Sequence, residues 1–175
     1  MFGRKKSKNE QARPTEWRVG DKFCILGYGV GTVLDITRGD PPMIVGDVDE
    51  RRMSIPIGRE HESMRPPMSR SRAEQALTDL LASGPPATIP WDEDLGNRCL
   101  ELGASNDIDS QISLFRTMLG AIEPAPSVKL QLVRFERAIL GEIAHVLGRP
   151  HDDLIDVVRN SSTAWRHERD EEAPD

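Results

Sequence analysis

The chain has 175 residues, of which 37% are hydrophobic and 30% are charged, and its formal net charge is −6 at pH 7. This balance fits one or two small soluble domains, and no apolar run approaches the roughly 20 residues that a membrane span needs. Because no apolar signal-peptide core follows the polar start MFGRKKSKNEQARPTE, we expect a cytoplasmic protein.

Charge is concentrated at the two ends of the sequence. Residues 1–18 carry six basic and two acidic side chains, whereas the stretch from Glu168 carries one arginine and five acidic side chains. These patterns predict a disordered basic arm over 1–16 and a disordered acidic tail over 161–175. The basic arm has two open interpretations, contact with nucleic acid or a solubilising extension.

Short strands and tight turns are predicted after the arm. The segments DKFCILG, GVGTVLDITR, MIVGDV and RRMSIPI are rich in β-branched and aromatic residues and are bounded by turn residues. Strands this short suit a small, strongly bent sheet, so we expect a β barrel of the Tudor or SH3 kind over 17–69.

Three glycines between the first two predicted strands, Gly27, Gly29 and Gly31, raise the question of a phosphate-binding loop. Such a loop needs a lysine followed by serine or threonine, or the spacing G-x-G-x-x-G, with a helix directly after it. Here the strand-like segment TVLDIT follows instead. The glycines are therefore expected to serve a tight turn or a bulge.

Helical periodicity begins near Ser71 and continues to about residue 160. Ser71 and Glu74 have the spacing of a capping box, and the prolines of SGPPATIP end the first helix. Gly148 and Pro150 end a later, longer helix, and HDDLIDVVRN supplies a short last one. Two further helices are predicted by apolar residues at helical spacing. The first has Ile108, Ile112, Phe115, Leu119 and Ile122 on one face, and the second, longer helix has Val128, Leu132, Phe135, Ile139, Ile143 and Val146. The expected fold class is thus α+β, with a helical bundle domain over 70–160.

Four passages of the chain, in this order, resemble one known family. They are WRVGDKFCILGYGVGTVLDI, then MSIPI with SMRPPMS, then IPW at 89–91, and FERAILGEIAHVLG in the long helix. Together they are similar to the CarD family of bacterial RNA-polymerase-binding transcription regulators, over roughly residues 17–148. The resemblance implies a Tudor-like domain that docks on the polymerase β subunit, and a helical domain that touches promoter DNA near the melting region.

The resemblance also implies site residues. On the polymerase side these are Arg38, Arg51, Arg52, Met53 and Ile55, where an exposed strand edge with arginines would suit β-augmentation and ion pairs to an acidic partner. The other interpretation of Arg51 and Arg52 is a solvated turn. The implied function is modulation of promoter open-complex formation by a protein that is not an enzyme, needs no cofactor and is a monomer.

The residues implied for DNA contact lie close to acidic residues in the sequence. Trp91 is implied as a wedge in the minor groove, with Arg98 nearby for phosphate contact. Asp92, Glu93 and Asp94 follow Trp91 directly, however, and would repel a phosphate backbone. Two alternatives therefore remain, in which Trp91 only packs on the bundle, or the acidic helical domain binds another protein and not DNA.

No catalytic or metal-ligating pattern stands out. His151, Asp152 and Asp153 could suggest a metal-dependent hydrolase, but carboxylates at the start of a helix more often interact favourably with its dipole. The paired Cys and His spacings of zinc sites are absent. Cys24 and Cys99 lie far apart among apolar residues and are expected to be buried, reduced thiols.

Overall fold

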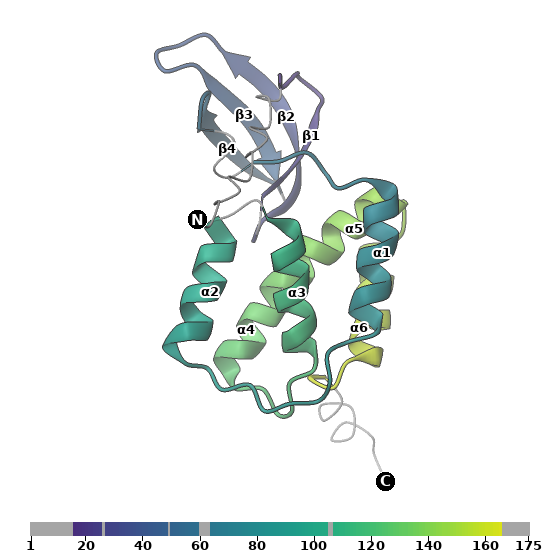
Figure 1. The fold of residues 1–175 in the computed structure, drawn as a ribbon. Coiled ribbons are helices and arrows are strands. Elements are labelled where there is room, and N and C mark those ends of the chain that lie inside the picture. Colours follow the sequence, from purple (N-terminus) through teal and green to yellow (C-terminus); the bar gives the residue numbers. More distant parts are fainter. Residues whose placement is uncertain (1–15, 26, 49, 60–63, 105–106, 166–175) are drawn as a thin grey trace, which may run out of the picture.

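The computed structural model describes residues 16–25, 27–48, 50–59, 64–104 and 107–165. Within this part of the chain, an antiparallel sheet of four strands precedes the helices, so the fold is α+β as predicted (Figure 1). The sheet lies at one end of the helical part. Apart from Glu16, the predicted basic arm lies outside the described residues.

The sheet is formed by β1 (Lys22–Ile25), β2 (Gly29–Thr37), β3 (Met43–Val48) and β4 (Arg51–Pro56), each within one of the predicted segments. The strands pair antiparallel in the order β1-β2-β3-β4, so β4 is an edge strand of this sheet. A small hydrophobic core lies against the sheet and consists of Phe23, Ile25, Val33, Ile44, Val48 and Met64.

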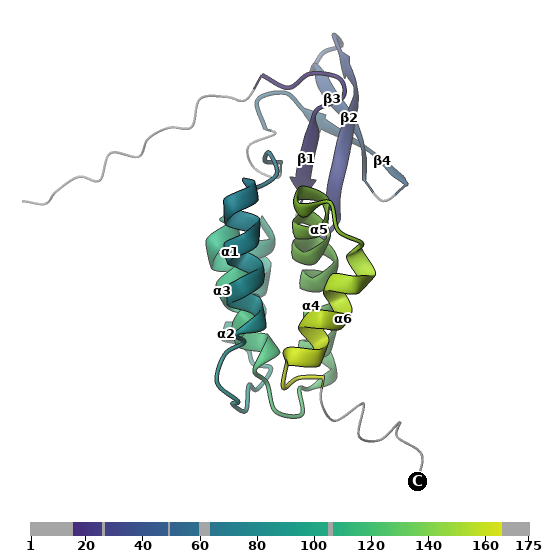
Figure 2. The ribbon, with the colours of Figure 1, turned by 90° about the vertical axis from the view of Figure 1, so that its right-hand side faces the viewer.

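The helices form two groups that run side by side (Figure 2). One group contains α1 (Arg70–Leu81), α2 (Glu93–Ala104) and α3 (Ile108–Leu119). The other contains α4 (Pro126–Phe135), α5 (Gly141–Leu147) and α6 (His151–Ser161). Their apolar faces share one core that is separate from the core under the sheet.

The predicted long helix is present and has one irregular turn. A π-helical segment, η2 (Glu136–Leu140), joins α4 to α5. Val128, Leu132, Phe135, Ile139 and Ile143 are all buried, which confirms the apolar face expected from their spacing. The helix ends at Gly148, whose φ of 66° is the left-handed conformation that glycine adopts without steric cost.

Two helix details differ from the sequence predictions. The cap of α1 is Ser69, whose side chain accepts a hydrogen bond from the Arg72 N–H at 3.3 Å, and not Ser71. Ile122 was expected to continue the apolar face of α3, but the helix ends at Leu119, and Ile122 is exposed because Gly120 and Ala121 turn the chain.

The first residues of the predicted acidic tail, 161–165, are ordered and not disordered, and residues 166–175 lie outside the described residues. Helix α6 continues to Ser161, and Ala164 and Trp165 are buried in the helical core. The backbone N–H of Ala164 donates to the Leu119 carbonyl at 3.1 Å, a normal hydrogen-bond length. Burial of the Trp165 ring holds this segment in place in a way that the charge pattern did not reveal.

None of the helices in the described ranges has the length and apolar character needed to cross a membrane.

Candidate functional site

The sheet and the helices are joined by a buried ion pair. The Arg65 guanidinium donates to both carboxylate oxygens of Glu142, with Nη1–Oε1 at 2.7 Å and Nη2–Oε2 at 2.6 Å. The Met68 N–H donates to the same Glu142 Oε1 at 2.7 Å. Because three charge-assisted hydrogen bonds meet on one carboxylate in α5, the segment after β4 is held firmly on the helical part.

The backbone of Arg65 continues this junction into the sheet. Its N–H donates to the carbonyl of Cys24 on β1 at 3.2 Å, and its carbonyl accepts from the Cys24 N–H at 2.8 Å. Burial raises the pKa of the Cys24 thiol far above its ordinary value, and the nearby Glu142 carboxylate adds to the rise. Burial alone would lower the pKa of Arg65, but its pairing with Glu142 outweighs this and raises it. The junction therefore holds a neutral thiol and a fully formed ion pair.

Gly27 in the β1–β2 turn, and Gly29 and Gly31 in β2, serve turn geometry and close packing. Gly27 and Gly29 have φ values of 85° and 96°, which L side chains rarely adopt. At Gly31 the space is too small for a side chain, because a Cβ there would lie 2.4 Å from a methyl carbon of Val48 and 2.6 Å from the Phe23 ring. The chain continues from these glycines as strand β2, as predicted, and not as the helix that a phosphate loop requires.

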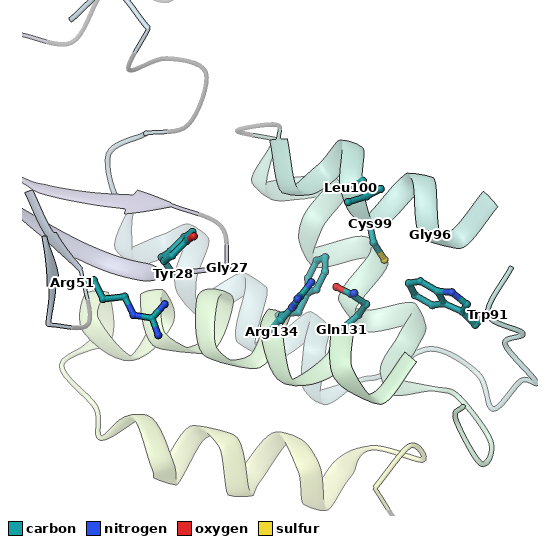
Figure 3. A pocket seen from close by; sticks show the side chains of 10 residues that line it. Gly27, Tyr28, Arg51, Trp91, Gly96, Cys99, Leu100, Gln131 and Arg134 are labelled. Carbon is teal, nitrogen blue, oxygen red and sulfur yellow. The ribbon is translucent and has the colours of Figure 1, made fainter. Parts of the chain in front are cut away.

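An open groove lies between α2 and α4, beside the junction. It runs from Arg51 and Tyr28 at the sheet end to Trp91 at the far end, and its volume is about 690 Å³ (Figure 3). The remaining described residues that line it are Gly27, Gly96, Cys99, Leu100, Gln131, Arg134 and Phe135. This volume is within the usual range for binding sites in proteins.

Trp91 lies two residues before α2 and is 38% exposed. Its ring rests on Gly96, since a Cβ at that glycine would be 3.5 Å from the ring. The carboxylate of Asp92 accepts a hydrogen bond from the Leu95 N–H at 2.8 Å, and Glu93 and Asp94 lie in the first turn of the helix. These three acidic residues thus stabilise the start of α2, and the Trp91 ring remains partly open to solvent.

The predicted polymerase-side residues are distributed over the whole sheet. Arg51 and Arg52 are exposed at the start of β4, within a strand and not in a turn. Arg38 directly follows Thr37, the last residue of β2. Thr37 pairs with Met43, and Met43 pairs with Pro56, so Arg38 lies near the end of β4 that is opposite Arg51. Five residues of strand, about 17 Å, therefore separate Arg38 from Arg51 along the sheet.

Two other predicted residues of this set are partly core residues. The side chains of Met53 and Ile55 pack against the small hydrophobic core under the sheet. Their alternation with Arg52 and Ser54, which are exposed, follows the two-residue period of a strand. Only part of each of these two side chains is therefore free for a partner.

The predicted DNA-side pair, Trp91 and Arg98, does not share one cavity. Arg98 is exposed on α2 and borders a smaller hollow of about 260 Å³ with Glu101, Ser110 and Ser113. Trp91 lines the groove instead, together with Arg134 and Gln131 from α4. These two α4 residues were not identified from the sequence, because they occupy positions between the apolar residues of their helix that carry no distinguishing motif.

No metal-binding cluster occurs among the described residues. Asp152 and Asp153 lie in the first turn of α6, where carboxylates stabilise the positive end of the helix dipole. Cys24 and Cys99 are buried free thiols, as predicted. Burial raises the pKa of Cys99 as well, although Arg98 partly opposes the rise.

No protein-family model matches this chain, and no curated protein matches it either.

Proposed function

We propose that the chain is a transcription regulator that binds the β subunit of bacterial RNA polymerase through its sheet and modulates promoter open-complex formation. The order of the parts supports this proposal, because a small antiparallel sheet is followed by a helical domain, as the resemblance to the CarD family implies. In this proposal the sheet is a Tudor-like module, and the segment around Met64 completes its core.

The observation that carries the proposal is the edge strand β4. It is the last strand in the order of the sheet, and its side chains at Arg51, Arg52 and Ser54 are exposed. An edge strand offers backbone N–H and C=O groups to a strand of a partner, while arginines beside it attract acidic residues. This combination suits β-augmentation by an acidic strand of the polymerase.

Arg52 is the better candidate for that contact than Arg51. Arg51 lines the groove that faces the helices, whereas Arg52 lies next to it on the same strand and is not part of the groove lining. Successive side chains of a strand point to opposite faces, so Arg52 is directed away from the groove. A partner strand added to β4 would meet Arg52 without entering the space between α2 and α4.

Binding to the purified β subunit tests this proposal, with the full-length chain as the ligand. Arg52→Glu should weaken binding by tenfold or more, equivalent to about 1.4 kcal/mol. Arg116→Glu on α3 is the matched control, because Arg116 is exposed and far from β4 in the sequence, and it should leave the affinity unchanged. If the wild-type chain fails to bind the β subunit at micromolar concentration, the proposal is wrong.

A second function, a protein-binding adaptor without DNA contact, is favoured by one observation. The acidic residues next to Trp91 are positioned to cap α2, which places negative charge beside the ring. Neutralising Glu93 and Asp94 to Gln and Asn should strengthen promoter binding if this end of α2 faces phosphate, and the gain should fade with added salt. If this variant binds promoter DNA no more strongly than wild type at low salt, the adaptor function is favoured.

A further inference from the structure

The groove between α2 and α4 is a local exception in an acidic protein. Two arginines, Arg51 and Arg134, are among the residues that line it, and none of the described lining residues is acidic. Neither arginine forms an ion pair with any acidic residue in the described part of the chain. In a chain with a net charge of −6, Arg51 and Arg134 attract a negatively charged segment to this groove, whereas Asp92, Glu93 and Asp94 next to Trp91 repel one at its far end.

The groove also has apolar walls that are open to solvent. Trp91, Leu100 and Tyr28 are all exposed, and Leu100 most of all at 72%. Arg134 and Gln131 extend from α4 between Trp91 at one end and Tyr28 at the other (Figure 3). An extended peptide could therefore lie along the groove with its carboxylates on the arginines and its aliphatic atoms on the rings.

The end of the chain supplies a segment of the required charge. The eight residues from Glu168 to Asp175 contain five acidic side chains and one arginine, a net charge of −4. The described part of the chain ends at Trp165. Ten residues follow Trp165 in the sequence, which span up to about 35 Å when extended.

Trp165 is anchored close to the helix that forms one wall of the groove. Its ring lies 4.5 Å beneath the Arg159 guanidinium, and Arg159 donates to Glu136 at 2.7 Å. Glu136 follows Phe135, which lines the groove, directly in the sequence. From this anchor the chain has only to pass around one helix, about 10–12 Å wide, to reach Arg134.

We propose that the groove is a binding site for acidic peptide and that its occupant is the chain's own segment Glu168–Asp175. Because the segment is tethered, its effective concentration near the groove is on the order of millimolar, so even a weak interaction leaves the groove substantially occupied. The attraction is between exposed charges and therefore falls as salt is added.

Occupation of the groove has a functional consequence that rests on the proposed function. The segment fills the groove beside Trp91 at Arg134 and Arg51, so it competes with any promoter DNA or partner protein that enters this groove. Docking itself does not depend on polymerase and is measurable in the isolated chain. A failure of docking is therefore distinguishable from a failure of the proposed function.

Paramagnetic relaxation in the full-length chain tests the docking. A nitroxide label is attached at Ala173→Cys, and labelling at this one position is verified by mass because Cys24 and Cys99 are buried. We expect loss of amide intensity at Gly96, Leu100 and Gln131 in low salt. The loss should disappear at about 1 M salt, where the Debye length is about 3 Å.

Paired substitutions assign the effect to the groove. Arg51→Gln with Arg134→Gln should abolish the intensity loss, whereas Arg116→Gln with Arg149→Gln removes the same charge from exposed positions outside the groove and should preserve it. The proposal is overturned if intensity is lost elsewhere, for example in the basic residues 1–18, or if the first pair of substitutions has no more effect than the second.

Discussion

Two arginines from the sheet side of the molecule approach the helices and end in opposite environments. Arg65 is largely buried and makes a bidentate ion pair with Glu142. Arg51 lies at the mouth of an open groove and has no acidic partner among the described residues. The first arrangement fixes how the sheet is attached to the helices, and the second leaves a positive charge available to a ligand.

The comparison separates structural charge from binding charge. A buried carboxylate such as Glu142 depends on its partner, because removal of either group leaves the other without compensation in a poorly solvated site. An exposed guanidinium such as that of Arg51 remains solvated and loses little when its neighbours change. Substitutions in the two regions should therefore differ in their effect on stability and in their effect on binding.

The largest expected effect comes from breaking the buried pair. Glu142→Ala should lower the free energy of unfolding by about 3–5 kcal/mol, since it leaves the Arg65 charge and the Met68 N–H without their acceptor. Urea denaturation of the full-length chain measures this. The matched control is Glu101→Ala on α2, an exposed glutamate that should change stability by no more than about 0.5 kcal/mol. Equal effects of the two substitutions would contradict the role of the junction.

Two tryptophans provide a second comparison of a buried and an open position. Trp165→Ala should cost about 3 kcal/mol or more, because its ring is buried and stacks with Arg159. Trp91→Ala should cost only about 1 kcal/mol, because the ring is partly exposed and rests on Gly96. Thermal and urea unfolding measure both. A larger loss for Trp91 would mean that the groove is part of the core.

The smallest expected change in stability is in the groove. Arg51→Gln combined with Arg134→Gln should alter the free energy of unfolding by no more than about 0.5 kcal/mol, because neither side chain has an ion-pair partner among the described residues. Chemical denaturation in parallel with wild type measures the difference. A loss of 2 kcal/mol, which is about the size of a core substitution, would show that these arginines support the fold.

Local patterns in the sequence predicted most of the fold. Alternation and turn residues predicted the four strands, and the spacing from Val128 to Ile143 predicted the buried face of the long helix. The cap at Ser69 was misplaced because Ser69 and Ser71 are both suitable caps, and Glu74 favoured the wrong one. The π-helical turn at Glu136–Leu140 has no signal in the apolar spacing.

The candidate site was much less predictable. Arg65 and Glu142 are 77 residues apart, so only the folded chain shows that they pair. The groove combines side chains from the β1–β2 turn, β4, α2 and α4, none of which is distinctive in its own segment. Trp91 was identified from the resemblance of the passage IPW at 89–91 to the CarD family, but its exposure and its position on Gly96 depend on tertiary structure.

The lifetime of a promoter open complex is the most direct test of the proposed function, because it depends both on polymerase binding and on an effect at the promoter. Purified bacterial RNA polymerase is mixed with linear promoter DNA, and decay of the open complex is followed with and without the full-length chain. We expect the wild-type chain to change this lifetime, Arg52→Glu to abolish the change and Arg116→Glu to preserve it. An unchanged lifetime at saturating wild-type chain would show that the protein does not act on the open complex.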